Sequence, residues 1–230
     1  QKLTRNVKNF EKKDLWDTIV SDDDHLKLFN YCLNRDKKNF KNIISKSNKT
    51  NLMKGFLNYY SYNDLNSSKK NRNKEATQFL DKLISLAEYR KLIPVFNPEQ
   101  GKWLVSDLKF TDILKDVFKY KNKNIKPFQS PNFTYGLNNE SDFYCLKDLK
   151  SLYTAFKINE LSKIYEFKQI SEIGSGLGYL PYYSSKLNYL NYHVYDLPNI
   201  LILQAYFLMI SLGEEQIHLY GETKNNNNKI

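Results

Sequence analysis

Cysteine is scarce in this sequence, and the two cysteines lie far apart. Cys32 and Cys145 are the only cysteines among 230 residues, and neither has a second thiol at a spacing typical of metal ligands. A disulfide-rich secreted scaffold and a cysteine-based zinc site are therefore excluded. We expect both cysteines to be reduced, buried thiols of a cytoplasmic protein, and we predict no metal site.

Long apolar runs are also missing. No stretch of about 18 apolar residues occurs, so we expect no membrane partner. The chain begins Gln-Lys-Leu, without the charged and then apolar start of a signal peptide. Because an initiator Met is absent, we expect that the native N-terminus lies further upstream.

The charge is strongly basic but poorly focused. A formal net charge of +10 and a pI near 9.3 would suit an anionic partner such as nucleic acid. The lysines are scattered, however, and no dense arginine patch accompanies them, so we do not expect nucleic acid as the partner. Hydrophobic residues make up 41% of the chain and aromatic residues 15%, which is enough to bury a core.

Residues 1–125 have a mostly helical pattern. Apolar residues recur at helical spacing, and Asp22 to Asp24 stand at a plausible helix start. Pro98 and Gly101 provide the turn of a short hairpin near 93–106. We predict helical stripes, an exposed lysine-rich loop and a connector at these positions: helices at 15–20, 26–33, 52–60, 79–87 and 108–118, the loop at 63–74 and the connector at 119–139.

Residues 126–230 alternate between strands and helices. A strong helical stripe from Leu149 to Ile164 precedes a short strand, a glycine turn and two further strand–helix alternations. Such alternation predicts an α/β domain, with a parallel sheet and helices on both faces. We therefore expect two parts that meet at about residue 125.

Three of the eight glycines fall in one turn. Gly174, Gly176 and Gly178 directly follow the predicted strand 169–173. Glycines at this spacing let a strand turn sharply into a helix and let the backbone approach a ligand. The rival dinucleotide pattern needs its third glycine at position 179, which is Tyr, so NAD is disfavoured. Glu172, two residues before the first glycine, suits a cationic ligand.

An acid follows each of the next two predicted strands. Asp196 ends the strand 192–195 and comes 18 residues after Gly178, where a carboxylate can accept hydrogen bonds from ribose hydroxyls. An alternative role is a helix N-cap before Leu197 and Pro198. Glu222 follows the third predicted strand, 216–220, and is placed either to meet an adenine amino group or in an exposed loop.

These three motifs resemble the first three motifs of class I S-adenosylmethionine-dependent methyltransferases. They lie at Glu172 to Gly178, at Asp196 and at Gly221-Glu222. Over about residues 130–225 the chain is also similar to bacterial putative sugar O-methyltransferases, through the segments 152–156, 195–201, 204–208 and 219–222. The resemblance implies a Rossmann-like, three-layer α/β/α domain that binds S-adenosyl-L-methionine. The cofactor-binding residues that it implies are Glu172, Gly174, Ser175, Gly176, Gly178, Asp196, Leu197 and Glu222.

The resemblance further implies methyl transfer to a hydroxyl of a sugar or a similar small polar molecule. The alternatives are an RNA methyltransferase, suggested by the charge, and a non-catalytic domain with the same fold. No general base is identified, so the catalytic residues stay unknown and the oligomeric state stays open. We expect His193 and His218 to be packed within strands and His25 to lie on a helix surface. Tyr135, Tyr179 and Tyr182 either line the mouth of the site or pack in the core.

The domain is expected to be incomplete. Only three strands of its sheet are predicted before the polar tail at 223–230. The base and most of the acceptor pocket would then lie further along the chain. An unpaired apolar strand edge would favour aggregation.

Overall fold

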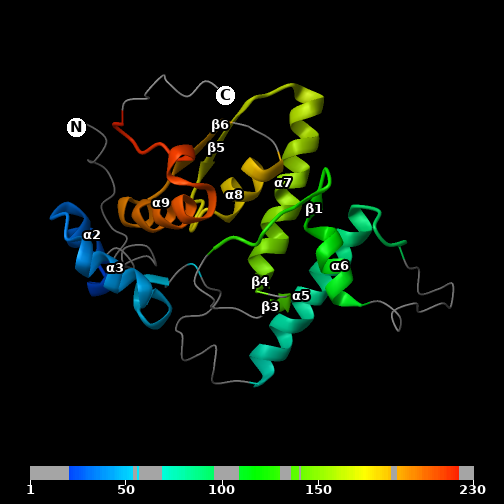
Figure 1. Cartoon of the computed structure of the whole chain (residues 1–230), viewed down its shortest axis with the longest axis horizontal. Helices are drawn as coiled ribbons and strands as arrows, with labels where there is room; N and C mark the ends of the chain where they lie inside the picture. Colours follow the sequence, from blue (N-terminus) through cyan, green and yellow to red (C-terminus); the bar gives the residue numbers. More distant parts are fainter. Residues whose placement is uncertain are drawn as a thin grey trace, which may run out of the picture. The chain divides into compact units, whose positions relative to one another are not determined.

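The computed structural model in Figure 1 describes residues 21–53, 56, 69–95, 109–129, 136–139, 141–187 and 191–222. The chain divides into two compact units, residues 1–65 and 66–230, whereas the sequence predicts a division at about residue 125. The described residues have a mixed α/β structure, with helices and small sheets. The predicted helix at 15–20 and most of the predicted hairpin at 93–106 lie outside the described residues.

Two helices and two short 3-10 turns make up the described part of the first unit. Asp22 caps α2 (Asp23–Leu33) by accepting a hydrogen bond from the Asp24 amide at 3.0 Å, which confirms the predicted helix start. Helix α3 (Lys37–Ser45) and the turns η1 (Ser47–Lys49) and η2 (Asn51–Met53) follow. The prediction for His25 is wrong: it is buried, because it lies one turn before the fully buried Leu28 on the same helix face.

Three helices pack together in the second unit. They are α5 (Lys69–Tyr89), α6 (Phe110–Val117) and α7 (Leu146–Tyr165), and α5 packs against both of the others. Helix α5 already includes residues 69–74, which the sequence assigns to a loop. That segment has no Gly or Pro and is rich in good helix formers, so nothing in it stops the helix. Leu83, Leu114 and Leu152 are fully buried in the core.

Arg90 links the end of α5 to the end of α6. Its guanidinium donates hydrogen bonds to the carbonyl oxygens of Asp116, Val117 and Lys119, and it lies 4.7 Å from the ring centroid of Phe156. The last carbonyls of a helix have no partner within the helix, so the guanidinium satisfies them.

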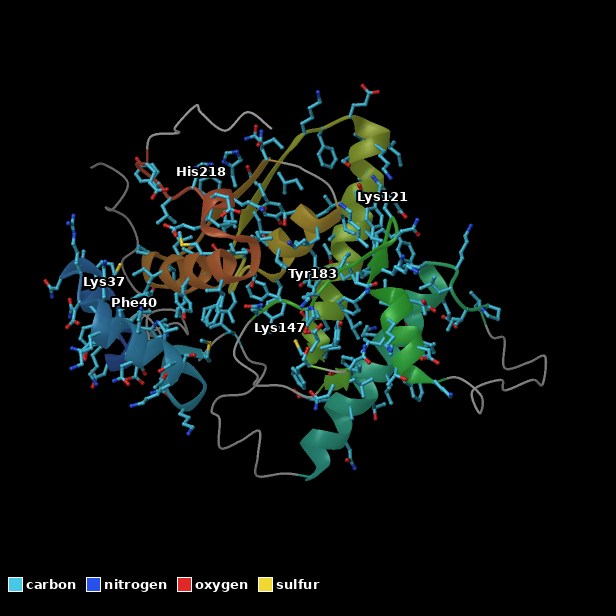
Figure 2. The ribbon with its side chains drawn as sticks, in the orientation of Figure 1. Lys37, Phe40, Lys121, Lys147, Tyr183 and His218 are labelled. Carbon is cyan, nitrogen blue, oxygen red and sulfur yellow. The ribbon has the colours of Figure 1, made fainter. Side chains whose placement is uncertain are left out.

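The predicted connector 119–139 contains regular structure, so that prediction is partly wrong. Strands β1 (Lys119–Tyr120) and β2 (Lys123–Asn124) form a hairpin, and β3 (Gly136–Asn139) pairs antiparallel with β4 (Asp142–Cys145). Lys121, labelled in Figure 2, and Asn122 form the turn of the first hairpin. Their φ values are 47° and 62°. A turn with two positive φ values usually contains glycine, and its absence here hides the signal.

A parallel β-α-β unit follows α7. It consists of β5 (Gln169–Ile173), α8 (Tyr179–Leu187) and β6 (Asn191–Tyr195), and it leads into α9 (Pro198–Leu212) and η5 (Glu214–Gln216). The two strands pair in parallel, from Gln169 opposite Asn191 to Ile173 opposite Tyr195. The first two predicted strands, the glycine turn and the following helices are thereby confirmed (Figure 1).

One face of this strand pair is bare in the described structure. Alternate residues of both strands are exposed, including Ile173 (87%), Tyr195 (57%) and His193, so within the described residues no helix covers this face. The prediction of a packed His193 is wrong for the same reason, because its side chain belongs to the bare face.

The prediction of a third strand at 216–220 is wrong. Residues 214–216 form η5, and residues 217–219 have no regular structure. The Leu219 amide donates to the Glu222 carboxylate at 2.9 Å, and the Glu222 amide donates to the Leu219 carbonyl at 3.1 Å. This local turn uses backbone groups that a strand would offer to a neighbour. His218 is exposed there rather than packed (Figure 2).

Among the helices that the structure describes, none has the length and apolarity to cross a membrane.

Candidate functional site

A glycine loop joins β5 to α8. Gly174, Gly176 and Gly178 have φ of 77°, 62° and 94°, a region that residues with a Cβ seldom adopt. The Gly174 amide donates to the Tyr195 carbonyl at 2.9 Å, so the loop starts where the parallel ladder ends. The predicted reason for three glycines, a sharp turn at the end of a strand, agrees with this geometry.

Gly178 also permits close helix packing. A Cβ built on Gly178 would lie 2.9 Å from Cγ of Leu208 on α9, which is closer than carbon atoms can approach. In the dinucleotide pattern this packing position would be residue 179, but in this chain residue 178 has that role. Gly174 differs, because a Cβ built there meets no atom within 4 Å and the space beside it is open.

Asp196 holds the loop from the end of β6. One carboxylate oxygen accepts from the Gly176 amide at 3.1 Å, and the other accepts from the Leu197 amide at 2.9 Å. The N-cap alternative for Asp196 is wrong, because Leu197 is the N-cap of α9 and Pro198 opens the helix. The buried Gln204 of α9 donates to the Gly176 carbonyl at 3.0 Å, a contact that the sequence does not reveal.

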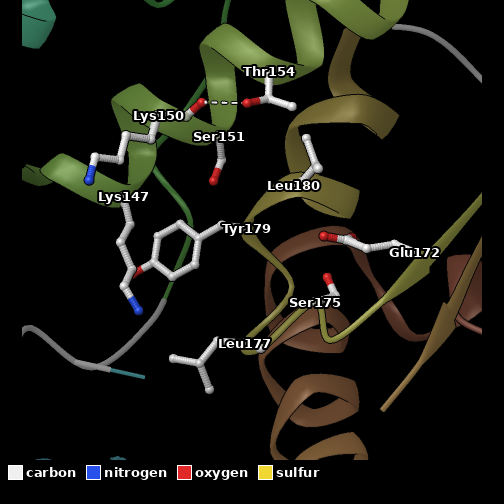
Figure 3. Close-up of a pocket in the computed structure, with 10 residues that line it drawn as sticks. Lys147, Lys150, Ser151, Thr154, Glu172, Ser175, Leu177, Tyr179 and Leu180 are labelled. Carbon is white, nitrogen blue, oxygen red and sulfur yellow. Dashed lines mark hydrogen bonds between the residues drawn. The ribbon is translucent and has the colours of Figure 1, made fainter. Parts of the chain in front are cut away.

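A pocket of about 270 Å³ lies between the glycine loop and α7 (Figure 3). Glu172, Ser175 and Gly176 line it on the loop side, so the structure brings these three predicted site residues together. The Glu172 carboxylate accepts a hydrogen bond from the Tyr192 hydroxyl at 2.8 Å. Burial, together with this bond, raises the pKa of Tyr192, so its hydroxyl stays a donor.

Helix α7 supplies the opposite wall. Four residues of this helix line the pocket, and none of them is predicted as a site residue from the sequence: Lys147, Lys150, Ser151 and Thr154. Their spacing of three, four and seven residues places them on one helix face, but such a polar stripe is usually just solvated. Tyr179 also lines the pocket, which agrees with the first of its two predicted roles, a place at the mouth of the site.

The other predicted tyrosines do not join the pocket. Tyr182 packs in the core, where its hydroxyl donates to the Lys126 carbonyl at 2.9 Å, and Tyr135 lies outside the described residues. Ser175 has a buried hydroxyl that lacks a hydrogen-bond partner among the described residues. Glu222 is exposed in its own turn and is not among the residues that line the pocket.

A buried carboxylate fixes the start of α7 behind this wall. Asp148 accepts hydrogen bonds from the amides of Phe128 (3.2 Å) and Cys145 (2.7 Å) and from the Tyr183 hydroxyl (2.7 Å). Burial raises the pKa of Asp148, although these three donors oppose the rise. Burial also raises the pKa of the Cys145 thiol to about 12. Tyr183 is fully buried as well (Figure 2).

The two cysteines have different surroundings. Cys145 is buried, as predicted, but Cys32 is exposed in the last turn of α2, where the neighbouring Leu33 is exposed too. Within the described residues, no group of three His, Cys, Asp or Glu side chains could hold a metal ion.

Comparison with known proteins identifies no relative. No protein-family model matches the chain, no curated protein matches its sequence, and no solved structure matches its fold.

Proposed function

We propose that this protein binds S-adenosyl-L-methionine and transfers its methyl group to a hydroxyl of a sugar or a similar small polar molecule. The proposal includes a Rossmann-like, three-layer fold for the domain that contains β5 and β6. The observation that carries it is the hydrogen bond between the Gly176 amide and the Asp196 carboxylate, at the carboxyl ends of two parallel strands. In open parallel sheets, ligands bind at this end of the strands.

The residues around the loop fit the cofactor. The open space beside Gly174 leaves room for a ligand against the backbone, and Glu172 faces the pocket with a negative charge that suits an ammonium group. Asp196 would accept hydrogen bonds from the ribose. S-adenosylmethionine supplies a methyl group on a sulfonium, and the chain supplies binding and orientation for its in-line transfer. None of the residues that line the pocket is assigned as the base that takes the proton from the acceptor's hydroxyl.

Calorimetric titration tests the proposal. We expect saturable binding of S-adenosylmethionine and no binding of NAD. Replacing Glu172 by Gln should weaken S-adenosylmethionine binding by about tenfold or more, since a hydrogen bond to a charged group contributes about 1.5 to 3 kcal/mol. Glu214→Gln is the matched control, because Glu214 is exposed and does not line the pocket. An unchanged affinity in Glu172→Gln, or no binding to the unaltered chain, contradicts the proposal.

Methyl transfer itself needs a second assay. Radiolabelled methyl groups should pass from S-adenosylmethionine to one member of a panel of sugars and sugar derivatives, and Asp196→Ala should abolish the transfer. Because Asp196 also holds the loop, the thermal midpoint of this variant must be measured beside its activity. Transfer to RNA but to no small hydroxyl compound would contradict the proposed acceptor class.

A further inference from the structure

The α7 wall of the pocket has a chemistry that the proposed cofactor role does not use. Lys147, Lys150, Ser151 and Thr154 stand on one face of α7, across the pocket from Glu172 and Ser175 (Figure 3). The wall therefore offers two lysines and the Ser151 hydroxyl to a ligand. The Lys150 side chain extends away from the glycine loop in Figure 3, and the Thr154 hydroxyl donates to the Lys150 carbonyl at 3.1 Å.

The two lysines are held without counter-charges. Neither makes an ion pair within 4.0 Å to any other described residue. Burial lowers the pKa of Lys147, and the neighbouring positive charge of Lys150 lowers it further. The Lys147 ammonium lies 6.0 Å from the ring centroid of Tyr179, which is a weak contact. Lys147 is partly buried, whereas Lys150 is exposed. Taking the Lys147 charge out of water without a partner is costly, and an anionic ligand would offset that cost.

A charge count indicates which ligand is anionic. At neutral pH, S-adenosylmethionine carries an ammonium, a sulfonium and a carboxylate, so its net charge is one positive. The pocket contributes two lysines and Glu172, and Asp196 binds the pocket residue Gly176, so these four side-chain charges cancel. The bound cofactor then leaves one positive charge unbalanced. A phosphate on the second substrate would supply the missing negative charge.

We propose that the methyl acceptor is phosphorylated and that Lys147 and Lys150, with the Ser151 hydroxyl, bind its phosphate. Lysine binds phosphate well as a point charge, and a hydroxyl can donate one more hydrogen bond. The acceptor class is then a sugar phosphate or a similar phosphorylated hydroxyl compound. This inference rests on the proposed function, which it deepens by naming the charge of the acceptor.

The test is titration of glucose 6-phosphate, with glucose as the uncharged comparison, into the full chain with and without S-adenosylmethionine. We expect glucose 6-phosphate to bind and glucose not to bind. The positive cofactor should tighten phosphate binding, and phosphate should tighten cofactor binding by the same factor. In the double variant Lys147→Met, Lys150→Met, glucose 6-phosphate affinity should fall by at least about tenfold.

Two controls keep the test decisive. Lys163→Met removes an exposed lysine of the same helix and should change nothing. Lys150→Glu alone places a negative charge at an exposed position, so it should weaken phosphate binding without a risk to the core. Equal glucose 6-phosphate affinity in the unaltered chain and the double variant overturns the inference. If S-adenosylmethionine binding falls instead, the lysines bind the carboxylate of the cofactor.

Failure of the proposed function gives a different result. In that case the unaltered chain does not bind S-adenosylmethionine at all. The titration of the cofactor-free chain still decides whether the α7 wall binds phosphate, because it needs no cofactor.

Discussion

The contact between Gly178 and Leu208 allows a quantitative test of the glycine loop. In Gly178→Ala, the new methyl group would lie 2.9 Å from Cγ of Leu208 and 3.0 Å from both of its terminal methyl carbons. Leu208 is itself buried, so it has little room to move aside. The variant also forces a residue with a Cβ to a φ of 94°.

The two effects have separate magnitudes. A positive φ costs a residue other than glycine about 1 to 2 kcal/mol. Overpacking by one methyl group in a core costs about 1 to 3 kcal/mol. Gly178→Ala should therefore lower the free energy of unfolding by about 2 to 5 kcal/mol. Gly174→Ala is the matched control, since it has a φ of 77° but open space, and it should cost only the first amount.

Urea unfolding followed by far-ultraviolet circular dichroism measures both variants. The double variant Gly178→Ala, Leu208→Ala should recover the overpacking part, so the two substitutions should couple favourably by about 1 to 3 kcal/mol in a double-mutant cycle. Equal destabilisation by Gly178→Ala and Gly174→Ala, with no coupling to Leu208, would refute the role of Gly178 in helix packing.

Three further predictions concern other parts of the chain. Arg90→Met should lower the free energy of unfolding by about 1 to 3 kcal/mol, because the C-terminal carbonyls of α6 lose their donor, and thermal unfolding measures the loss. At pH 8 in the folded chain, a disulfide reagent such as dithionitrobenzoate should modify the exposed Cys32 quickly and the buried Cys145 only on unfolding. The free energy of unfolding should fall as the pH rises from about 9 to about 12, since the Cys145 thiol ionises near 9 when unfolded but near 12 when folded.

Each of these predictions has a control. Lys91→Met changes an exposed neighbour of Arg90 and should alter stability by less than about 0.5 kcal/mol. Rapid modification of two thiols in the folded chain would show that Cys145 is accessible. The variant Cys145→Ala should reduce the alkaline loss of stability, and an unchanged pH dependence would mean that other groups cause it.

The sequence predicts the β-α-β unit well because its signals are local. The three glycines mark the turn after β5, and Pro198 marks the start of α9. These signals depend on neighbours within a few residues, so they do not need the rest of the fold. The glycine loop and Asp196 were found for the same reason, because a turn and a strand end are visible in the residue order.

Features that depend on contacts distant in sequence escaped prediction. An apolar segment at 216–220 looks like a strand, but the Glu222 side chain takes the Leu219 amide and no other strand pairs with it in the described structure. The exposure of His193 depends on what covers the sheet, which no local pattern reveals. Lys147 and Ser151 look like ordinary surface residues until the glycine loop is placed opposite them.

The Asp148 network has a consequence for the order of folding. Its donors come from residues 3, 20 and 35 positions away, at Cys145, Phe128 and Tyr183. All of these residues precede α9, and closing loops of this length costs little more entropy than closing shorter ones. During synthesis from the N-terminus, the network can therefore close before α9 has left the ribosome. The wall of the pocket would then be in place first, and the glycine loop would be completed against it when Asp196 and Gln204 arrive.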